Sequence, residues 1–569
     1  MSNQKTYDFD AIVIGSGISG GWAAKELTEK GLKVLVLDRG RPLEHGSGYL
    51  GEHAPSWKLP FNGRPNRKLN EEQYFIQSKS YAFGEANRQF WNNDKDNPYA
   101  YDGNDPFIWT RSDVVGGRSL LWGRQSYRFS EQDFKANEQD GHGIPWPVTY
   151  DEIAPWYSYV EKFAGINGMK EGLPQLPDGE FQKPMPWYKL ETVVKERLAE
   201  NAPDITLTSA RTAILTENLP GRAACHYCGP CERGCSTGSY FSSQASTLPA
   251  AKATGRMTLR ANALVEKLEY DADGKRISRV HVIDTETRER TSFTGRLVFL
   301  CASTIATAQI LFLSANRHFP NGLANSSGVL GHYLMDHFSG IGTVGIFPEF
   351  QDTYYFGNRP TGLYIPRFRN VGKQDEDADF VRGYGYQTNT SCSNWTSSLV
   401  SKGFGADYKE RLRKPGGWSW YVGGFGECLP QKRNRLYMHP TKKDRFGLPQ
   451  MAFDFQWHDN ERAMVRDIRK QSDRILKAAN AAYAISFGDP DNMPLPGAAI
   501  HEMGTARMGD DPRESVLNKY NQAHDIPNLF ITDGSFMASS SCVNPSLTYM
   551  AFTARACDYA VKQLEAGAI

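Results

Sequence analysis

The sequence lacks the uninterrupted hydrophobic run of about 18 residues that a membrane-spanning helix requires. The nearest candidate is 297–313, LVFLCASTIATAQILFL, which Ser, Thr and Gln interrupt. We expect a buried strand followed by a helix there, and no transmembrane segment. The N-terminal MSNQKTYDFD also lacks the apolar core of a signal peptide and a twin arginine, so we expect no export signal on this chain.

The chain also has almost no net charge. It contains 65 Lys and Arg against 64 Asp and Glu, a formal charge of +1. This balance excludes the basic surface typical of a nucleic-acid-binding protein and argues against a polybasic membrane anchor. Hydrophobic residues make up 40% and charged residues 23%, as in ordinary globular proteins rather than disordered chains or coiled coils. At roughly 100–200 residues per domain, the length predicts three or four domains or one large discontinuous fold.

Cysteine is scarce and unevenly placed. Four of the nine Cys lie within eleven residues, namely Cys225, Cys228, Cys231 and Cys235. The others are scattered, which does not suggest a disulfide framework in a chain of this length. No C-x-x-C-H motif is present, so we expect no c-type haem on this chain.

The first forty residues predict a βαβ unit. A strand, a helix and a second strand are expected at 9–14, 18–30 and 33–37. Gly15, Gly17 and Gly20 give the first turn its G-x-G-x-x-G spacing, which permits close approach of a pyrophosphate at a helix N-terminus. Asp38 ends the second strand, where a carboxylate can accept hydrogen bonds from an adenosine ribose. The segment indicates binding of an ADP moiety and leaves FAD and NAD open.

Further elements follow along the chain. Residues 41–110 show no clear periodicity and are expected to form a long excursion, and 340–460 is expected to be rich in strands. The remaining predictions are a helix at 150–166, a hairpin of 264–270 and 277–284, a strand and helix at 296–300 and 303–314, and a strand and helix at 529–533 and 546–564.

Several motifs together resemble the GMC (glucose–methanol–choline) oxidoreductase family. They are the N-terminal βαβ unit, GGRSLLWG, ASTIATAQILFLS, HEMGTARMG, ITDGS and NPS, in the order of the family and over essentially the whole chain. Within the family the chain most resembles the large subunits of bacterial sugar dehydrogenases, which include glucose, gluconate and fructose dehydrogenases and glucoside 3-dehydrogenases. The resemblance implies an α/β protein with a Rossmann-like FAD-binding domain made of discontinuous segments, and a substrate domain around an antiparallel sheet.

The resemblance also implies domain boundaries. The FAD-binding domain would comprise 1–45, 105–150, 200–330 and 495–569, with an iron–sulfur loop at 225–235. The substrate-binding domain and its excursions would comprise 46–104, 151–199 and 331–494.

An active-site pair is implied by the family's H-x-x-G-T motif and a later His or Asn. Here these residues are His501 and Asn544. Oxidation of an alcohol removes a hydroxyl proton and a hydride, and a neutral imidazole with an unperturbed pKa near ~6.5 is a suitable proton acceptor. An amide NH₂ can hold the alcohol oxygen without competing for the proton. The alternatives without a catalytic role are that His501 is an ordinary core histidine and that Asn544 is only a helix cap before Pro545. We expect Asn544 to cap the following helix in either case.

The resemblance places further residues around the cofactor. The cofactor-binding set is Gly15, Gly17, Gly20, Asp38, Gly116, Gly117, Ser119, Trp122, Val265, Asp533, Gly534, Asn544 and Pro545. Some relatives link FAD covalently through a His in the GGRSLLW region. No His occurs there in this sequence, so we expect non-covalent FAD.

The cysteine cluster has three interpretations. Structural zinc usually pairs two C-x-x-C knuckles across a longer gap, and disulfides or free thiols are the second alternative. The spacing C-x2-C-x2-C-x3-C favours an iron–sulfur cluster. Sugar dehydrogenase large subunits bind [3Fe–4S] through C-x5-C-x3-C, which Cys225, Cys231 and Cys235 reproduce, while Cys228 as a fourth ligand would imply [4Fe–4S].

These features predict an FAD-dependent dehydrogenase that oxidises a sugar or glucoside hydroxyl with His501 as base, our preference being the C3 hydroxyl, which gives a 3-keto sugar. The cluster would lead electrons to an external acceptor such as cytochrome c. Expected partners are a small chaperone-like subunit and a c-type cytochrome. We expect a periplasmic location through co-export with a signal-bearing partner, with the cytoplasm as the alternative.

Three other functions compete with this prediction. The first is an oxidase of the same fold that reduces O₂ to H₂O₂, and the second is a non-catalytic flavin-binding subunit. An NAD-dependent dehydrogenase is the weakest, because the sequence has no second dinucleotide fingerprint.

Overall fold

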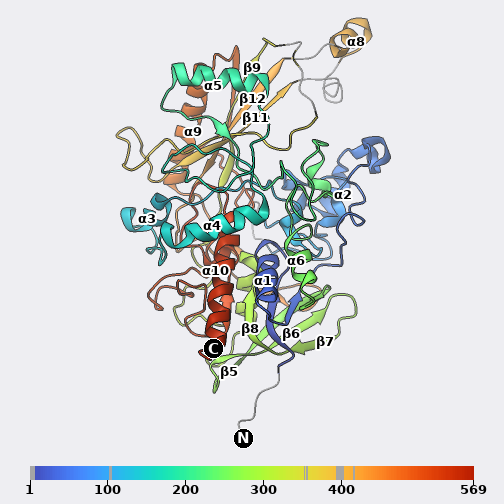
Figure 1. Ribbon diagram of the computed structural model, residues 1–569, viewed down its shortest axis with the longest axis vertical. Coiled ribbons are helices and arrows are strands. Elements are labelled where there is room, and N and C mark those ends of the chain that lie inside the picture. Colours follow the sequence, from blue (N-terminus) through green and yellow to red (C-terminus); the bar gives the residue numbers. More distant parts are fainter. Residues whose placement is uncertain (1–6, 101–105, 351–352, 354–356, 393–402, 414–416) are drawn as a thin grey trace.

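The computed structural model describes residues 7–100, 106–350, 353, 357–392, 403–413 and 417–569 (Figure 1). Two sheets organise the chain, a parallel sheet in the lower half of Figure 1 and an antiparallel sheet in the upper half. No helix in these described ranges combines the length and the hydrophobicity that crossing a membrane requires.

The parallel sheet has the strand order β16-β8-β1-β2-β4, and every pairing is parallel. Its strands are β1 (Phe9–Ile14), β2 (Val34–Leu37), β4 (Met257–Arg260), β8 (Gly295–Leu300) and β16 (Leu529–Ile531). Strands β1, β2, β8 and β16 are largely apolar because both faces of the sheet are covered, whereas the edge strand β4 is partly exposed. Figure 1 shows α1 (Ile18–Glu29) and α10 (Ser546–Glu565) side by side over one face, where Val13 and Phe299 pack against them.

The opposite face of this sheet packs against a second, smaller sheet. Its strands are β5 (Ala263–Asp271), β6 (Arg276–Asp284) and β7 (Arg290–Phe293), joined as antiparallel neighbours. Ile12 and Val298 share a core with Val280 of β6. Helix α7 (Thr304–Leu313) follows β8 and packs beside β5.

The antiparallel sheet has the order β15-β9-β12-β11-β10-β3. Its strands are β3 (Thr208–Ser209), β9 (Phe338–Phe347), β10 (Leu363–Ile365), β11 (Tyr384–Cys392), β12 (Trp418–Gly426) and β15 (Tyr483–Phe487). Helix α9 (Asp459–Ala478) covers one face through Met464, Ile468 and Leu476, which recur at helical spacing. The other face turns toward the parallel half.

The other elements connect these layers. They are α2 (Arg67–Gln73), α3 (Glu131–Asp140), α4 (Tyr150–Ala164), α5 (Lys189–Asn201), α6 (Thr247–Ala253), α8 (Gly405–Arg413), β13 (Arg435–Lys443) and β14 (Pro449–Asp454).

Most predicted elements are confirmed within a few residues, namely β1, α1, β2, α4, the β5–β6 hairpin, β8, α7, β16 and α10. The expectation that 340–460 is rich in strands is confirmed, since β9 to β14 lie there, and the helix α8 is an addition within that range. The two-domain division stays a prediction. One detail bears on its boundary, since β3, inside the predicted 200–330 segment, pairs with β10 of the antiparallel sheet.

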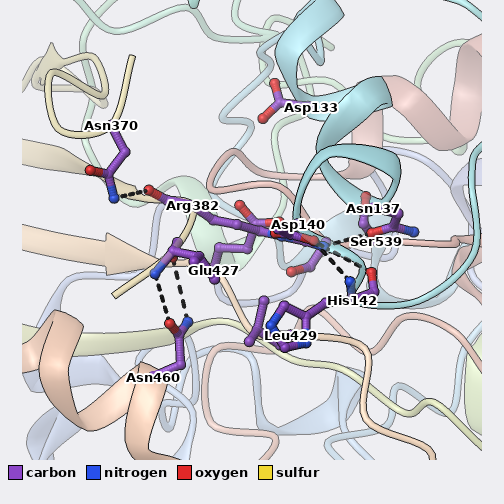
Figure 2. A network of polar contacts seen from close by, with 12 residues as sticks. Asp133, Asn137, Asp140, His142, Asn370, Arg382, Glu427, Leu429, Asn460 and Ser539 are labelled. Carbon is purple, nitrogen blue, oxygen red and sulfur yellow. Dashed lines mark hydrogen bonds and ion pairs between the residues drawn. The ribbon is translucent and has the colours of Figure 1, made fainter. Parts of the chain in front are cut away.

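A buried polar network ties α3 to the antiparallel sheet (Figure 2). Arg382, just before β11, donates through Nε to Asp140 Oδ2 at 2.8 Å and through Nη2 to Asn137 Oδ1 at 2.7 Å. Its Nη1 donates to Glu427 Oε1 at 2.8 Å. Asn137 in turn donates to the carbonyl of Ala538 at 3.0 Å. The network therefore anchors the segment that leads to Asn544.

Replacing Arg382 by Leu should destabilise the protein. The side chain is 2% exposed and that of Glu427 is 1% exposed, so the substitution leaves buried acceptors unpaired. Breaking one partner of a buried ion pair costs about 3–5 kcal/mol. Urea unfolding followed by tryptophan fluorescence measures the loss. Arg513→Ala, in the exposed pair with Asp511, is the control that should leave the transition unchanged, and equal midpoints for the two variants would contradict the expectation.

Candidate active site

A cavity of about 500 Å³ lies between the carboxyl edge of the parallel sheet and the antiparallel sheet. Segments from both ends of the chain meet in its wall. The predicted residues that line it are Gly15, Gly17, Asp38, Gly117, Ser119, Trp122, His501, Asp533, Gly534 and Asn544. Val265 lines a smaller cavity of about 100 Å³ that shares Gly15, Arg39 and Ala302 with the large one. Gly20, Gly116 and Pro545 are neighbours of lining residues.

The first turn leaves no room for a side chain at Gly15 or Gly20. Gly15 has φ +99°, and a Cβ there would lie 2.4 Å from the carbonyl oxygen of Cys301. A Cβ on Gly20 would lie 1.9 Å from the carbonyl oxygen of Gly15. No side chain caps α1, whose N-cap Gly17 faces the cavity. A bare helix N-terminus in a tight turn suits a pyrophosphate, so these residues fit a dinucleotide cofactor.

Asp38 lines the cavity but is already bonded within the protein. Its Oδ2 accepts hydrogen bonds from the backbone N–H and the hydroxyl of Ser16, and its Oδ1 accepts from Gly40 N–H at 2.7 Å. Burial raises the pKa of Asp38. The carboxylate thus fixes the first turn, and its contact with a ribose stays a prediction.

A second Gly-rich segment, residues 116–123 (GGRSLLWG), is hydrogen-bonded to this turn. Gly116, with φ +93°, donates from N–H to Ser16 Oγ at 2.8 Å. Ser119 Oγ donates to the Gly116 carbonyl at 2.6 Å, and Trp122 Nε1 donates to the Phe241 carbonyl at 3.1 Å. The segment therefore forms one wall of the cavity next to the start of α1.

His501 and Asn544 meet in the cavity. The Nε2 atom of His501 lies 3.3 Å from Asn544 Nδ2. Gln387 of β11 donates through Nε2 to Asn544 Oδ1 at 2.7 Å. The expected helix cap is wrong, because α10 starts after Pro545 without a side-chain cap and the Asn544 amide is engaged by Gln387 instead.

Two residues that hold His501 were missed by sequence reasoning. Asp336 accepts hydrogen bonds from the backbone N–H of His501 at 2.9 Å and of Ala499 at 3.3 Å. His337 Nδ1 lies 3.0 Å from His501 Nδ1, and His337 Nε2 lies 2.7 Å from the carbonyl oxygen of Ser541. Their only sequence signal is an Asp–His pair before a strand-rich region.

The electrostatics keep both imidazoles neutral. Burial is the main cause that lowers the pKa of His501 well below its usual range, followed by repulsion from the positive charge of His337 when that ring is protonated and from Arg118. Burial lowers the pKa of His337 to about 4. Arg118 is itself paired with Glu502 through two hydrogen bonds of 2.8 Å. A neutral His501 is the form that can accept a proton.

The cysteine loop is near the second Gly-rich segment. Cys225, Cys231 and Cys235 are half-buried and pack with Met185, Ile214 and Tyr240, whereas Cys228 is exposed. No two cysteines of the described residues are joined by a disulfide bond. Across the described residues, no three His, Cys, Asp or Glu side chains are placed to hold one metal ion.

A buried arginine links this loop to the cavity wall. The Arg124 guanidinium lies 3.5 Å from the ring centroid of Tyr240. Its Nη2 donates to the carbonyl of Ser119 at 3.1 Å. Tyr240 donates from N–H to Cys235 Sγ at 3.5 Å. The loop and the second Gly-rich segment are thus separated by one guanidinium and one ring.

Comparison with known proteins identifies the family. Family models of GMC oxidoreductases match residues 9–339 and 430–553. The chain belongs to the GMC oxidoreductase family. It is 30% identical to 2-methyl-1,2-propanediol dehydrogenase of Mycolicibacterium austroafricanum, over 97% of this chain and 94% of that one. It is 27% identical to the fructose dehydrogenase large subunit of Gluconobacter japonicus, over 100% of both chains.

Solved structures agree on the fold. A formate oxidase of Aspergillus oryzae RIB40 superposes with a TM-score of 0.61 at 14% identity, covering 99% of this chain and 100% of that one. The GMC resemblance and the expected α/β fold are confirmed. This GMC oxidoreductase is an FAD-dependent enzyme that acts on CH–OH groups.

The lowered pKa of His501 predicts how the activity depends on pH. A base works when unprotonated, so a lowered pKa keeps it active to lower pH. We expect kcat/KM to stay level as pH falls through 6.5 and to decline only below it. Asp336, whose pKa burial raises to about 7, is the neighbour that titrates in this range. Profiles of the wild type and Asp336→Asn, with FAD content measured at each pH, separate the two groups. An acid limb centred at 6.5 or above in both proteins would contradict the prediction.

Proposed function

We propose that this enzyme is a sugar dehydrogenase that oxidises a ring hydroxyl, with the C3 hydroxyl of a glucoside as the preferred site and a 3-keto sugar as product. The observation that carries the proposal is the meeting of His501 and Asn544 in the cavity that the first Gly-rich turn also lines. In the proposed reaction, His501 Nε2 takes the hydroxyl proton, and Asn544 Nδ2 donates to the alcohol oxygen as its negative charge develops.

FAD is proposed to bind without a covalent link. The bare turn at Gly15 and Gly20 fits a pyrophosphate, and the wall from Ser119 to Trp122 offers no His for attachment. When bound, FAD supplies the hydride acceptor, and an iron–sulfur cluster supplies a one-electron route to an outside acceptor. Asn544 and Pro545 stand at the start of α10, whose N-terminus faces the same cavity.

The lining of the cavity supports a sugar as substrate. The rings of Trp122, Tyr421 and Phe425 and the amide of Gln125 line the same cavity as the His–Asn pair. Flat rings can pack against the faces of a sugar while amides bond its hydroxyls. The fructose dehydrogenase relative supports this choice by its name.

A small diol is the second candidate, because the 30% identical relative is named a 2-methyl-1,2-propanediol dehydrogenase. A dye-linked screen that compares kcat/KM for methyl glucosides and for propanediols, followed by NMR of the product, separates the two substrates and identifies the oxidised carbon.

The cysteine loop supports an iron–sulfur cluster, with [3Fe–4S] preferred over [4Fe–4S]. Cys225, Cys231 and Cys235 share one half-buried patch, while Cys228 is exposed. Thiolates are the ligands that such clusters use. A structural zinc ion is less well supported, because zinc sites usually pair two C-x-x-C knuckles across a longer gap than this eleven-residue loop offers.

The proposal extends to partners and location. The name of the fructose dehydrogenase relative describes a large subunit, which favours a multi-subunit enzyme. We propose a small chaperone-like subunit and a c-type cytochrome as partners, and a periplasmic location reached by co-export. The oxidase alternative predicts stoichiometric H₂O₂, and the non-catalytic alternative predicts no reduction of flavin by any sugar.

Replacing His501 by Ala tests the base. Turnover with an artificial acceptor should fall by roughly 10²–10⁴-fold, the usual contribution of a positioned general base. Asn544→Ala should also lower turnover, through the lost contact with the alcohol oxygen. FAD content, measured after release by acid, should stay near normal in both variants. Full activity of His501→Ala would reject the assignment, and flavin that stays on denatured protein would reject non-covalent binding.

Cysteine substitutions test the cluster. Cys231→Ser should remove iron and sulfide and abolish turnover with cytochrome c. Reduction of flavin by substrate in a single turnover should survive, because it needs only the base and the flavin. Cys228→Ser is the matched control and should keep its iron. Equal iron loss in both variants would favour [4Fe–4S], and anaerobically reconstituted protein that holds zinc or no metal would reject the cluster.

A further inference from the structure

A hydrogen-bond chain behind His501 determines which of its ring nitrogens carries the proton. His337 Nε2 lies 2.7 Å from the carbonyl oxygen of Ser541. A carbonyl only accepts, so this nitrogen of His337 carries a hydrogen. In a neutral imidazole the other nitrogen, Nδ1, then has the lone pair. His501 Nδ1 lies 3.0 Å from that lone pair, so it must be the donor.

The consequence reaches the cavity. With its proton on Nδ1, neutral His501 presents an unprotonated Nε2 on the side of Asn544. The low pKa of His337, about 4, keeps this chain in the same protonation state at neutral pH. His337 is 1% exposed, and its ring lies against that of Phe425, with centroids 4.8 Å apart. The ring of His337 is therefore shielded from water.

A second chain acts on Asn544 from the opposite side. Gln387 Nε2 donates to Asn544 Oδ1 at 2.7 Å, which turns Asn544 Nδ2 toward His501 Nε2. The reversed amide would place an acceptor against the His501 lone pair. The two hydrogen-bond series are therefore consistent with each other. They leave His501 Nε2 as an acceptor and Asn544 Nδ2 as a donor, 3.3 Å apart in the cavity.

We propose that His337 and Gln387 are positioning residues, which select the tautomer of His501 and the amide orientation of Asn544. The inference rests on the proposed roles of that pair. A substrate hydroxyl at this point donates to His501 Nε2 and accepts from Asn544 Nδ2. In the other tautomer Nε2 carries a hydrogen and cannot take the proton.

The backbone around both chains is held in the required shape. Ser541 and Ile500 have φ +54° and +64°, a region that residues other than glycine rarely adopt. The turn at Ile500 is closed by Asp336, which accepts from the N–H groups on both sides of it. The left-handed turn at Ser541 accompanies a carbonyl that points at His337.

Two substitutions of His337, with a control at His332, test which tautomer His501 adopts. Gln can accept from His501 Nδ1 and donate to the Ser541 carbonyl, whereas Leu can do neither. Rapid mixing with substrate should show a limiting rate of flavin reduction about 10–100-fold lower in His337→Leu, the same range as for loss of a partner that orients a metal-bound histidine. Substrate Kd and FAD content should change little. His337→Gln should recover to within about threefold of wild type. His332→Gln is the matched control, since His332 Nδ1 also contacts a carbonyl, that of Lys432, outside the cavity.

Gln387 provides an independent test if His337→Leu folds poorly. Leu removes the donor, whereas Glu replaces it by an acceptor that should attract Asn544 Nδ2 and turn Oδ1 toward His501. We expect Gln387→Glu to be slower than Gln387→Leu, and Gln387→Leu slower than wild type.

The outcomes separate the inference from the proposed function. Wild-type reduction rates in His337→Leu together with an inactive His501→Ala would overturn the positioning roles and leave the base in place. An active His501→Ala would reject the base itself. Failure of Gln to rescue position 337, or the reverse order of the two Gln387 variants, would also overturn the inference.

Discussion

A short backbone ladder between the segment just before β9 and the HEMGT segment is the constraint on which the site depends. Met335 and Met503 exchange hydrogen bonds of 2.9 Å, and Gly331 N–H donates to the Thr505 carbonyl at 2.7 Å. The chains approach so closely that a Cβ on Gly504, whose φ is +82°, would lie 2.0 Å from the Tyr333 carbonyl oxygen. The glycine of H-x-x-G-T is thus required by packing. The ladder joins the antiparallel sheet to the segment that carries His501, and it brings Asp336 and His337 to that residue.

The same region is supported from behind. The polar network of Arg382 reaches the Ala538 carbonyl through Asn137 (Figure 2). Trp146 donates to Ser539 Oγ at 2.8 Å, and Ser540 exchanges hydrogen bonds with the backbone of Cys428. The residues before Asn544 are therefore held one after another. These supporting contacts hold the Ser541 carbonyl toward His337 and the Asn544 amide toward His501.

The sequence was informative where function and local structure depend on nearby residues. The strand–glycine–helix pattern at 9–30 and the hairpin at 264–284 are local, and both are confirmed. His501 and Asn544 were recognised through family motifs, and the structure brings them together. His337 is 164 residues from its partner and Gln387 is 157 residues from Asn544. No local pattern reports such pairings, because tertiary packing alone creates them. No element was predicted for 461–494, where most of helix α9 lies, although its apolar residues recur at helical spacing.

The wall of the cavity is divided between segments beside the parallel sheet and strands of the antiparallel sheet. The first turn, the second Gly-rich segment, His501 and Asn544 all come from segments on the side of the parallel sheet. Tyr421 and Phe425 come from β12 of the antiparallel sheet. In the proposed reaction the first group contacts the reacting atoms, whereas Tyr421 and Phe425 are placed to contact the rest of the substrate. We therefore expect differences in substrate size to be accommodated on β12, while the ladder before β9 keeps that strand in a fixed relation to His501.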